Sequence, residues 1–384
     1  MRTTTAPRMR TKGPLRTVSS RTIVIKVGSS TVTGPDGRID REYLDTLAAQ
    51  VQRLRDDGDR AIVVTSGAIA AGLEALGLSA RPTDIATLQA TAAVGQVRLV
   101  EVYRDLFAAR GAHVGQVLVT RYDVGQRQQY LNACQTLERL LDLGAVPIVN
   151  ENDTTAVDEI KFGDNDYLAA LVGMMVHADL VVLLTDIDGL YSADPRVDAG
   201  ARLVERVDEL TDEHVAAAGG PGSAVGSGGM ATKLQAARAL MKACIPLVVC
   251  DGRRPDVILD AAAGRPVGTL FASGKTAVKS RKLWLAYAGQ ARGSVTIDAG
   301  ARDALCLRGK SLLPAGVIDV SGSFVVGDPV SLEDEEGRVV ARGIAGITAD
   351  DLRKVKGLKT AEVARLLPAW RGAEVVHRDR LVIL

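Results

Sequence analysis

Short apolar runs alternate with longer amphipathic stretches over the first two thirds of the chain. Runs at 62–64, 146–149 and 180–184 are rich in Val, Ile and Leu and have the length of buried strands. The stretches between them, such as 43–54 and 131–141, are rich in Ala and Leu and have helical spacing. This alternation predicts an α/β fold, in which a mostly parallel sheet is sandwiched by helices.

The pattern changes after residue 270. Residues 271–290 are richer in polar and basic side chains, as expected of a connector. Beyond them, short strand-like runs separated by Gly turns replace the alternation, at 294–297, 316–320, 328–332 and 338–344. We therefore expect one α/β domain over 22–270 and a small β-rich domain over 291–384.

The first 21 residues differ from the rest of the chain. They contain six Lys and Arg side chains and no Asp or Glu. This composition is typical of a flexible tail. A targeting segment, or a start of translation at Met9, stays an alternative.

The composition excludes several kinds of protein. Among 384 residues, 47% are hydrophobic, which is enough for a large core, and the formal net charge is +1. A charge so close to zero gives no global basic field for nucleic acid, and no apolar run approaches the roughly 20 residues that span a bilayer. The four cysteines include no Cys-x-x-Cys pair, which favours a reduced, cytoplasmic compartment.

Lys26 is the first candidate for chemistry. It lies at the end of an apolar run and is followed by Val27, Gly28 and Ser29. An ammonium group at this point can meet phosphate oxygens, while the unhindered amides of Gly28 and Ser29 donate hydrogen bonds to them. The pattern therefore predicts a phosphate-binding turn.

Four more polar segments follow a predicted strand or precede a predicted helix. In an open α/β sheet, ligands bind at the carboxyl ends of the strands, so these segments are expected to meet there. They are Val-Thr-Ser-Gly-Ala-Ile-Ala-Ala-Gly at 64–72, Asn-Glu-Asn-Asp at 150–153 with Gly-Asp-Asn-Asp at 163–166, Thr-Asp at 185–186, and Ser-Gly-Gly-Met-Ala-Thr-Lys at 227–233.

In this order, the five segments resemble the amino acid kinase family, and within it the enzymes that phosphorylate the side-chain carboxylate of glutamate. The resemblance covers nearly the whole chain from Thr22, and the β-rich part resembles a PUA domain. It implies that Lys26 and Lys233 bind phosphate as catalytic residues and that Asp166 holds them in place. Further residues are implied to bind the amino acid (Ser66, Asp153, Asp164 and Asn165) or ATP (Lys26, Gly28, Ser29, Thr185, Asp186, Ser227, Gly228, Gly229, Met230, Ala231, Thr232 and Lys233).

Structural roles stay open for some of these positions. Asp153 and Asp164 also suit turns or helix N-caps, and Asp186 suits a turn at a strand end. Gly228 and Gly229 also suit a hinge. The segment 221–229, rich in Gly and Ser, is a candidate lid.

The resemblance implies a specific reaction, the ATP-dependent formation of γ-glutamyl phosphate, which is the first step of proline biosynthesis. A carboxylate with a pKa of about 4.3 is already ionised at neutral pH, so it can attack phosphorus without a general base. Mg²⁺ would bridge the nucleotide phosphates and need few or no protein ligands. The resemblance also implies proline as a feedback inhibitor, γ-glutamyl phosphate reductase as a downstream partner, and a homo-oligomer.

Two kinds of alternative remain. Acetylglutamate kinase, aspartokinase and uridylate kinase share the sheet and the lysines, but the 150–153 segment together with a PUA-like domain favours glutamate as the substrate. An RNA-binding protein that acts through the PUA-like domain belongs to a different class. Against it, residues 291–384 contain 14 Arg and Lys against 13 Asp and Glu, and their only aromatic residues are Phe324 and Trp370.

Overall fold

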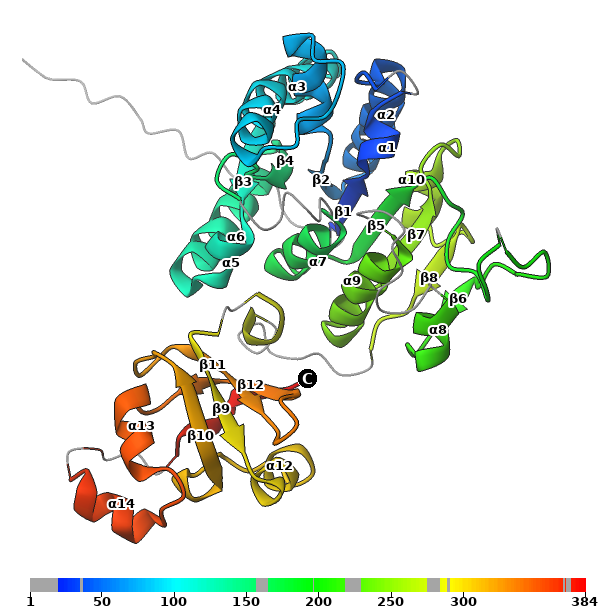
Figure 1. Cartoon of the computed structure of the whole chain (residues 1–384). Helices are drawn as coiled ribbons and strands as arrows, with labels where there is room; N and C mark the ends of the chain where they lie inside the picture. The colour runs from blue at the N-terminus through cyan, green and yellow to red at the C-terminus, as the bar shows by residue number, and fades with distance from the viewer. Residues whose placement is uncertain are drawn as a thin grey trace, which may run out of the picture.

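Two separate sheets organise the chain (Figure 1). The computed structural model describes residues 20–34, 37–156, 165–195, 197–217, 229–274, 284–288, 291–368, 370 and 374–384. In this part of the chain, no helix is long and apolar enough to cross a membrane. The sheets belong to an N-terminal α/β part and a C-terminal β-rich part, which confirms the predicted fold class.

The larger sheet is mostly parallel. Strands β7 (Leu247–Asp251) and β8 (Thr269–Phe271) pair antiparallel, and all other neighbouring strands of this sheet are parallel. In spatial order, the strands are β3 (Val114–Val119), β4 (Val146–Glu151), β2 (Arg60–Val64), β1 (Thr22–Val27), β5 (Leu180–Thr185), β7 (Leu247–Asp251), β8 (Thr269–Phe271) and β6 (Arg206–Val207).

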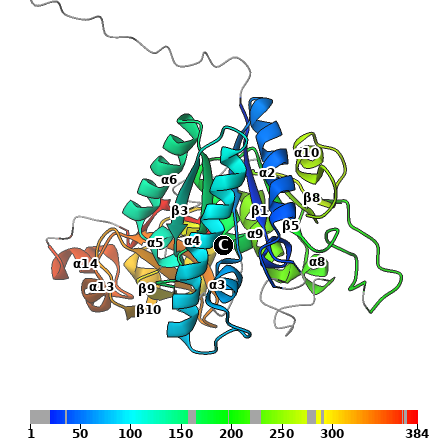
Figure 2. The same cartoon turned by 90° about the horizontal axis from the view of Figure 1, so that it is seen from above.

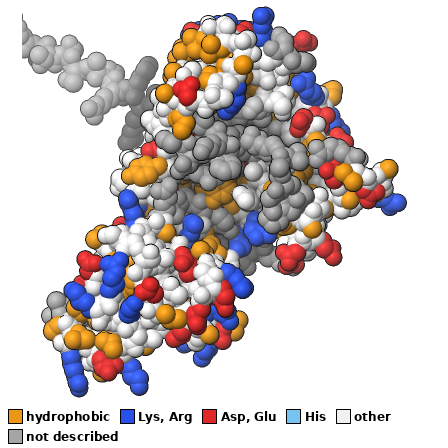
Figure 3. Space-filling view, in the orientation of Figure 1, with side chains coloured by type: hydrophobic (Ala, Val, Ile, Leu, Met, Phe, Trp, Pro, Cys, Tyr) orange, Lys and Arg blue, Asp and Glu red, His pale blue; other side chains and the backbone are white. Residues whose placement is uncertain are grey.

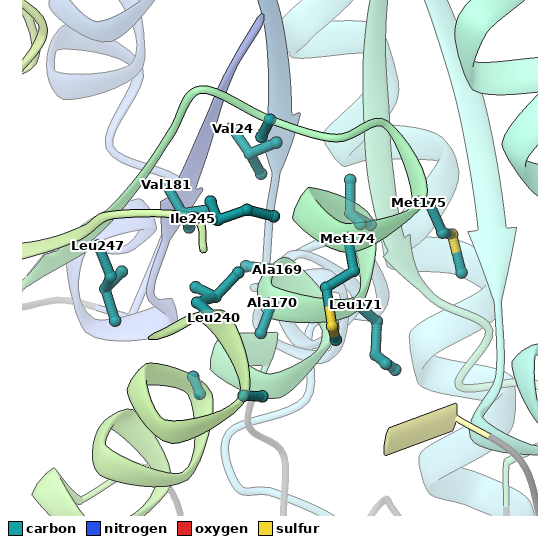
Figure 4. Close-up of a cluster of buried hydrophobic side chains, with 14 of the residues drawn as sticks. Val24, Ala169, Ala170, Leu171, Met174, Met175, Val181, Leu240, Ile245 and Leu247 are labelled. Atoms are coloured by element: carbon teal, nitrogen blue, oxygen red, sulfur yellow. The ribbon is translucent and has the colours of Figure 1, made fainter. Parts of the chain in front are cut away.

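Helices cover both faces of this sheet (Figure 1, Figure 2). One face packs against α2 (Arg41–Asp56), α4 (Ile85–Ala108) and α10 (Val257–Ala262). The other face packs against α6 (Arg127–Asp142), α7 (Asn165–Met175) and α9 (Met230–Lys242), and Figure 4 shows part of this core. Strands buried on both faces read as continuous apolar runs, which is why the sequence made them visible.

The helices predicted at 43–54 and 131–141 are confirmed as α2 and α6, each a few residues longer. Side-chain caps set some of the true starts. The side chain of Asp40 accepts a hydrogen bond of 2.9 Å from the Tyr43 N–H at the start of α2. Asp84 accepts one of 2.8 Å from Thr87 at the start of α4. Such caps satisfy amide groups that have no partner within the helix.

Helix α3 (Ala68–Leu76) contacts α4 backbone to backbone. A Cβ atom added at Gly72 would lie 1.9 Å from the Thr91 carbonyl oxygen, and one at Gly95 would lie 1.8 Å from the Ala68 carbonyl oxygen. Only glycine fits at either position. The contact holds the beginning of α3, directly after Ser66 and Gly67, against a long helix.

The C-terminal sheet has its own hydrophobic core. Strands β9 (Gly293–Ile297) and β11 (Pro329–Glu333) pair parallel, and the other neighbouring strands of this sheet are antiparallel. In spatial order, the strands are β10 (Val317–Gly322), β9 (Gly293–Ile297), β11 (Pro329–Glu333), β12 (Val339–Ala345) and β13 (Val376–Ile383). The four short strands predicted here are present, whereas the helices α12 (Ala299–Cys306), α13 (Ala349–Val355) and α14 (Thr360–Leu366) were not predicted.

A π-helix, η2 (Trp284–Ala288), joins the two parts. The Trp284 indole N–H donates a hydrogen bond of 2.9 Å to the Val124 carbonyl oxygen of α5 (Arg121–Gly125), and its ring centre lies 6.4 Å from that of Tyr130. The Arg127 guanidinium lies over both rings, 5.2 Å from the Trp284 centroid. Ile344 of the C-terminal sheet is buried in the same cluster. The sequence had indicated only a polar connector here.

The surface of the C-terminal part carries charges of both signs. Figure 3 shows Lys and Arg interspersed with Asp and Glu over this part of the molecule. Several of the basic side chains are paired, for example Lys356 with Asp319 and Lys354 with Asp351. On the face shown in Figure 3, this mixture of charges leaves little of the continuous positive stripe by which proteins follow a nucleic-acid backbone.

Candidate functional site

The alternation of side chains along the strands places two predicted residues on one face of the large sheet. On β1, Ile23 and Ile25 belong to the core beneath α2 and α4, whereas Val24 belongs to the core beneath α7 and α9. Lys26, two residues after Val24, therefore faces α7 and α9. By the same parity on β5, Thr185 follows Leu183 onto this face.

Lys26, Asp166 and Lys233 form a buried ion cluster. One oxygen of Asp166 pairs with the Lys26 ammonium, and the other lies 3.0 Å from the Lys233 ammonium. Asp166 is fully buried, and both lysines are 5% exposed. Burial by itself raises the pKa of the Asp166 carboxyl, but the two ammonium groups outweigh it and hold this pKa below its usual range.

Two of the three residues of the ion cluster lie in the first turns of helices. Asp166 is the second residue of α7 and Lys233 is the fourth of α9. A carboxylate is favourable at a helix N-terminus, whereas an ammonium group is not, so Lys233 adds positive charge to an end that is already partly positive. The Thr232 hydroxyl donates to the Gly229 carbonyl oxygen at 2.7 Å and lies 3.4 Å from Asp166. This end of α9 suits a bound anion.

A second cluster consists of amides and a hydroxyl. The Asn165 Nδ2 lies 2.5 Å from the Thr65 carbonyl oxygen, 2.7 Å from the Asn150 Oδ1 and 3.1 Å from the Ser66 Oγ. Asn150 and Ser66 are buried, as is Asn165. Because Asn165 and Asp166 are the first two residues of α7, that helix start joins the ion cluster to the amide cluster.

The start of α3 lies next to Ser66 and offers backbone N–H groups. Gly67 caps this helix with φ of 98°, a conformation that favours glycine, and no side chain caps the first turn. A Cβ atom on Gly67 would also lie 3.0 Å from the side chain of Val32. Uncapped amides at a helix N-terminus bind carboxylates and phosphates.

Asp153 lies on the turn after β4, three residues beyond Asn150. Burial raises the pKa of its carboxyl to about 6, and the nearby positive charge of Arg81 partly opposes this. A carboxylate that burial destabilises gains most from a cationic partner. Asp153 therefore suits an ammonium group.

The described candidates for ATP binding lie directly after Lys26, at the carboxyl end of the neighbouring strand β5, and at the start of α9. Gly28 accepts hydrogen bonds from the Thr31 and Val32 amides at 3.1 and 3.0 Å, and Ser29 begins the short helix α1 (Ser29–Val32). The Thr185 hydroxyl donates to Asp186 at 3.1 Å. Gly229 caps α9, and Met230, Ala231 and Thr232 form its first turn. Asp164, Ser227 and Gly228, like most of the proposed lid, lie outside the described residues.

Sequence reasoning missed residues that support these clusters from α4. Gly95 sets the close contact with α3, and the neighbouring Gln96 binds the side chain of Asn150 at 2.7 Å. The Tyr103 hydroxyl lies 2.8 Å from that of Thr65. The only signal in the sequence is a run of small residues before Gln96, and that pattern is common in helices.

Comparisons with known proteins cover most of the chain. A sequence model described as the amino acid kinase family matches residues 21–251, and one described as the PUA domain matches residues 293–367.

Individual relatives cover nearly the same length. A "Glutamate 5-kinase" of Myxococcus xanthus (strain DK1622) is 48% identical over 366 residues, which is 95% of this chain and 97% of that protein. A "Glutamate 5-kinase" of Synechococcus sp. (strain JA-3-3Ab) is 47% identical over 94% of this chain and 98% of that protein. Among solved structures, the carbamate kinase from Giardia lamblia bound to AMP-PNP matches 66% of this chain and 99% of its own, at 16% identity and a TM-score of 0.49.

Proposed function

Because this chain belongs to the amino acid kinase family, we propose that it is an ATP-dependent glutamate 5-kinase. It transfers the γ-phosphoryl group of ATP to the γ-carboxylate of glutamate and forms γ-glutamyl phosphate. The relatives that it matches over about 95% of its length carry the name of this activity. Glutamate is therefore favoured over N-acetylglutamate, aspartate and UMP as the acceptor.

The observation that carries the proposal is the meeting of the two clusters at the start of α7. Lys26 and Lys233 converge on Asp166, and the adjacent Asn165 belongs to the amide cluster with Ser66. The ion cluster suits phosphate, and the amide cluster suits an amino acid. A phosphoryl transferase needs these two binding functions side by side.

The chemical step requires positioning rather than a base. An oxygen of the ionised γ-carboxylate attacks the γ-phosphorus, the bond between that phosphorus and the β–γ bridging oxygen breaks, and ADP leaves. Each ammonium group has three N–H donors, so Lys26 and Lys233 can bind Asp166 and a phosphate oxygen together. They offset the charge on the transferring group and on the leaving oxygen.

Glutamate is held by groups of opposite character. The α3 amides and the Ser66 hydroxyl suit its α-carboxylate, and Asp153 suits its α-ammonium group. Asn165 orients the substrate from the start of α7, next to Asp166. We assign Asp164 to the same site from the sequence pattern alone.

ATP lies along the turn at Gly28 and Ser29 and the start of α9. Lys26 and Lys233 bind its phosphates, residues 229–232 form the start of α9 beside Lys233, and Thr185 and Asp186 mark the carboxyl end of β5. We assign Ser227 and Gly228 to the same site from the sequence pattern alone. Among the described residues, no three His, Cys, Asp or Glu side chains gather as a metal site. We assign Mg²⁺ to the nucleotide phosphates, where it would keep most of its waters.

The assembly around the reaction is also part of the proposal. We assign catalysis to residues 22–270, the connector to 271–290 and the PUA domain to 291–384. The enzyme works in the cytoplasm as a homo-oligomer, proline inhibits it near the amino-acid site, and a γ-glutamyl phosphate reductase consumes its labile product.

The deciding experiment compares acceptors. ADP release is followed by a coupled assay with glutamate, N-acetylglutamate, aspartate and UMP, each with ATP and Mg²⁺. We expect turnover with glutamate at least about a hundredfold faster than with the other three, because the amide cluster and Asp153 recognise a free amino acid. Turnover that favours another acceptor would refute the assignment.

A further inference from the structure

Gln96 belongs to the amide cluster, although no pattern in the sequence points to it. It lies on α4 next to Gly95 and is 8% exposed. Its Oε1 accepts a hydrogen bond of 2.7 Å from the Asn150 Nδ2. Its Nε2 is buried and has no hydrogen-bond partner in the described part of the chain. Buried amide groups are rarely left unpaired, so this one needs a reason.

Two backbone groups determine which way the amides in this cluster point. The Glu151 N–H donates to the Asn150 Oδ1 at 2.9 Å, which turns the Asn150 Nδ2 toward Gln96. The Thr65 carbonyl oxygen accepts from the Asn165 Nδ2 at 2.5 Å. Backbone groups cannot exchange donor for acceptor. Gln96 must therefore present its oxygen to Asn150, and its Nε2 is left over.

The same polarity passes on to the substrate residues. The Asn165 Nδ2 has only two hydrogens but three acceptors within reach, and the Ser66 Oγ is the most distant, at 3.1 Å. The Ser66 hydroxyl is thus the least committed group of the cluster. If Asn150 turned its amide over, two Nδ2 groups would face each other, and Asn165 would lose the contact that holds it.

We propose that Gln96 is a positioning residue for the amino-acid substrate. Together with the Glu151 N–H, its Oε1 holds the Asn150 amide in one orientation, and Asn150 in turn keeps Asn165 and Ser66 arranged for the acceptor. The inference rests on the proposed function only in naming glutamate as that acceptor. Among the residues that the structure describes, the Gln96 Nε2 is left without a partner because the Gln96 Oε1 must accept the hydrogen bond from Asn150. Functional sites often retain a local conflict of this kind.

The test uses Gln96→Met, which keeps the length of the side chain and removes the acceptor. The variant exchanges one unpaired buried donor, the Gln96 Nε2, for another, the Asn150 Nδ2. We therefore expect its melting temperature to stay within about 4 °C of the wild type. We expect the KM for glutamate to rise about tenfold or more, while the KM for ATP changes less than about twofold.

Gln50→Met is the matched control. Gln50 is 6% exposed, and its Oε1 accepts a hydrogen bond of 3.0 Å from the Ile258 N–H, in the core beneath α2 and α10. This variant also loses one buried acceptor, but it lies away from the amide cluster. We expect it to lower the melting temperature and to leave the KM for glutamate unchanged.

A double-mutant cycle tests whether Gln96 acts through Asn150. Asn150→Ala removes the side chain that Gln96 orients, so adding Gln96→Met to it should change the KM for glutamate by less than about twofold. Independent, multiplying effects would overturn the inference. So would an unchanged KM in Gln96→Met, or equal increases in the two KM values.

The same series separates a failure of this inference from a failure of the proposed function. Wild-type enzyme is first measured with the four acceptors named above. If glutamate is not the acceptor, the proposed function fails, and the cycle is run with the acceptor that reacts. An unchanged KM for that acceptor in Gln96→Met then overturns the positioning role on its own.

Discussion

The ion cluster predicts that replacing a lysine mainly lowers turnover, whereas replacing the carboxylate mainly lowers the stability of the fold. In Lys233→Met, Asp166 keeps Lys26 as its counterion, and the methionine fills most of the lysine's volume. In Asp166→Asn, the two ammonium groups stay buried without the carboxylate between them. We expect the first variant to fold well and turn over slowly, and the second to be strongly destabilised.

The magnitudes follow from the geometry. At 3.0 Å and an effective dielectric constant of about 20, one Lys–Asp pair is worth about 5.5 kcal/mol before the cost of desolvation. Breaking a buried pair by removing one partner typically costs about 3–5 kcal/mol, which we expect for Asp166→Asn. For Lys233→Met we expect about 1–2 kcal/mol, and a loss of turnover of about a hundredfold, or about 2.7 kcal/mol of transition-state stabilisation.

The destabilisation of Asp166→Asn should depend on pH. The pKa of Asp166 is lower in the folded protein than in the unfolded chain. Its contribution to stability is therefore fully present above the unfolded pKa of about 3.9 and is lost as the pH falls through the lower, folded pKa. The difference in unfolding free energy from the wild type should be constant between pH 6 and 8 and shrink only in acid.

Urea unfolding followed by circular dichroism gives the stabilities, and coupled ADP release with saturating ATP and glutamate gives the turnover numbers. Lys354→Met is the control, because it removes an exposed pair of similar length, 2.9 Å to Asp351, and should change stability by less than about 1 kcal/mol. Near-normal turnover in Lys233→Met would refute its catalytic role. Equal stability of Asp166→Asn and Lys233→Met would refute the charge cluster.

Three other predictions use separate parts of the molecule. The wild-type KM for glutamate should rise as the pH falls below about 6, because Asp153 becomes protonated there. The KM of Asp153→Asn should not depend on pH in this way. At pH 7 this variant should also unfold at a higher temperature than the wild type, because it lacks a carboxylate whose charged form is disfavoured by burial. Gly95→Ala should cost about 2 kcal/mol or more and raise the KM for glutamate, since its Cβ meets the Ala68 carbonyl oxygen. Gly300→Ala in α12 is the control and should be neutral or stabilising in urea unfolding, because its Cβ would meet the Asp298 Oδ1 at an ordinary contact distance of 3.4 Å. A chain that ends at Arg292 should fold and keep kinase activity, because the C-terminal sheet has a core of its own; an insoluble or inactive product beside active full-length enzyme would contradict this.

Local pattern was sufficient for the fold class and for many of the candidate residues. Strands buried on both faces appear as apolar runs, and helices appear as periodic ones, so both could be located before any contact was known. The position of Lys26 at a strand end and of Asp166 at a helix start likewise follows from neighbours in the sequence. The C-terminal helices were missed because short helices with one buried face leave little periodic signal.

Tertiary structure alone decided which of these residues lie together. Asn165 meets Thr65 across 100 residues of sequence, and Gln96 meets Asn150 across 54. How the helices pack also decides the glycine contact between α3 and α4 and the hydrogen bond from Trp284 to α5. No single segment of the sequence specifies that packing. A sequence records the burial and backbone freedom of each segment, but the polarity of a hydrogen-bond network depends on partners that only the folded chain brings together.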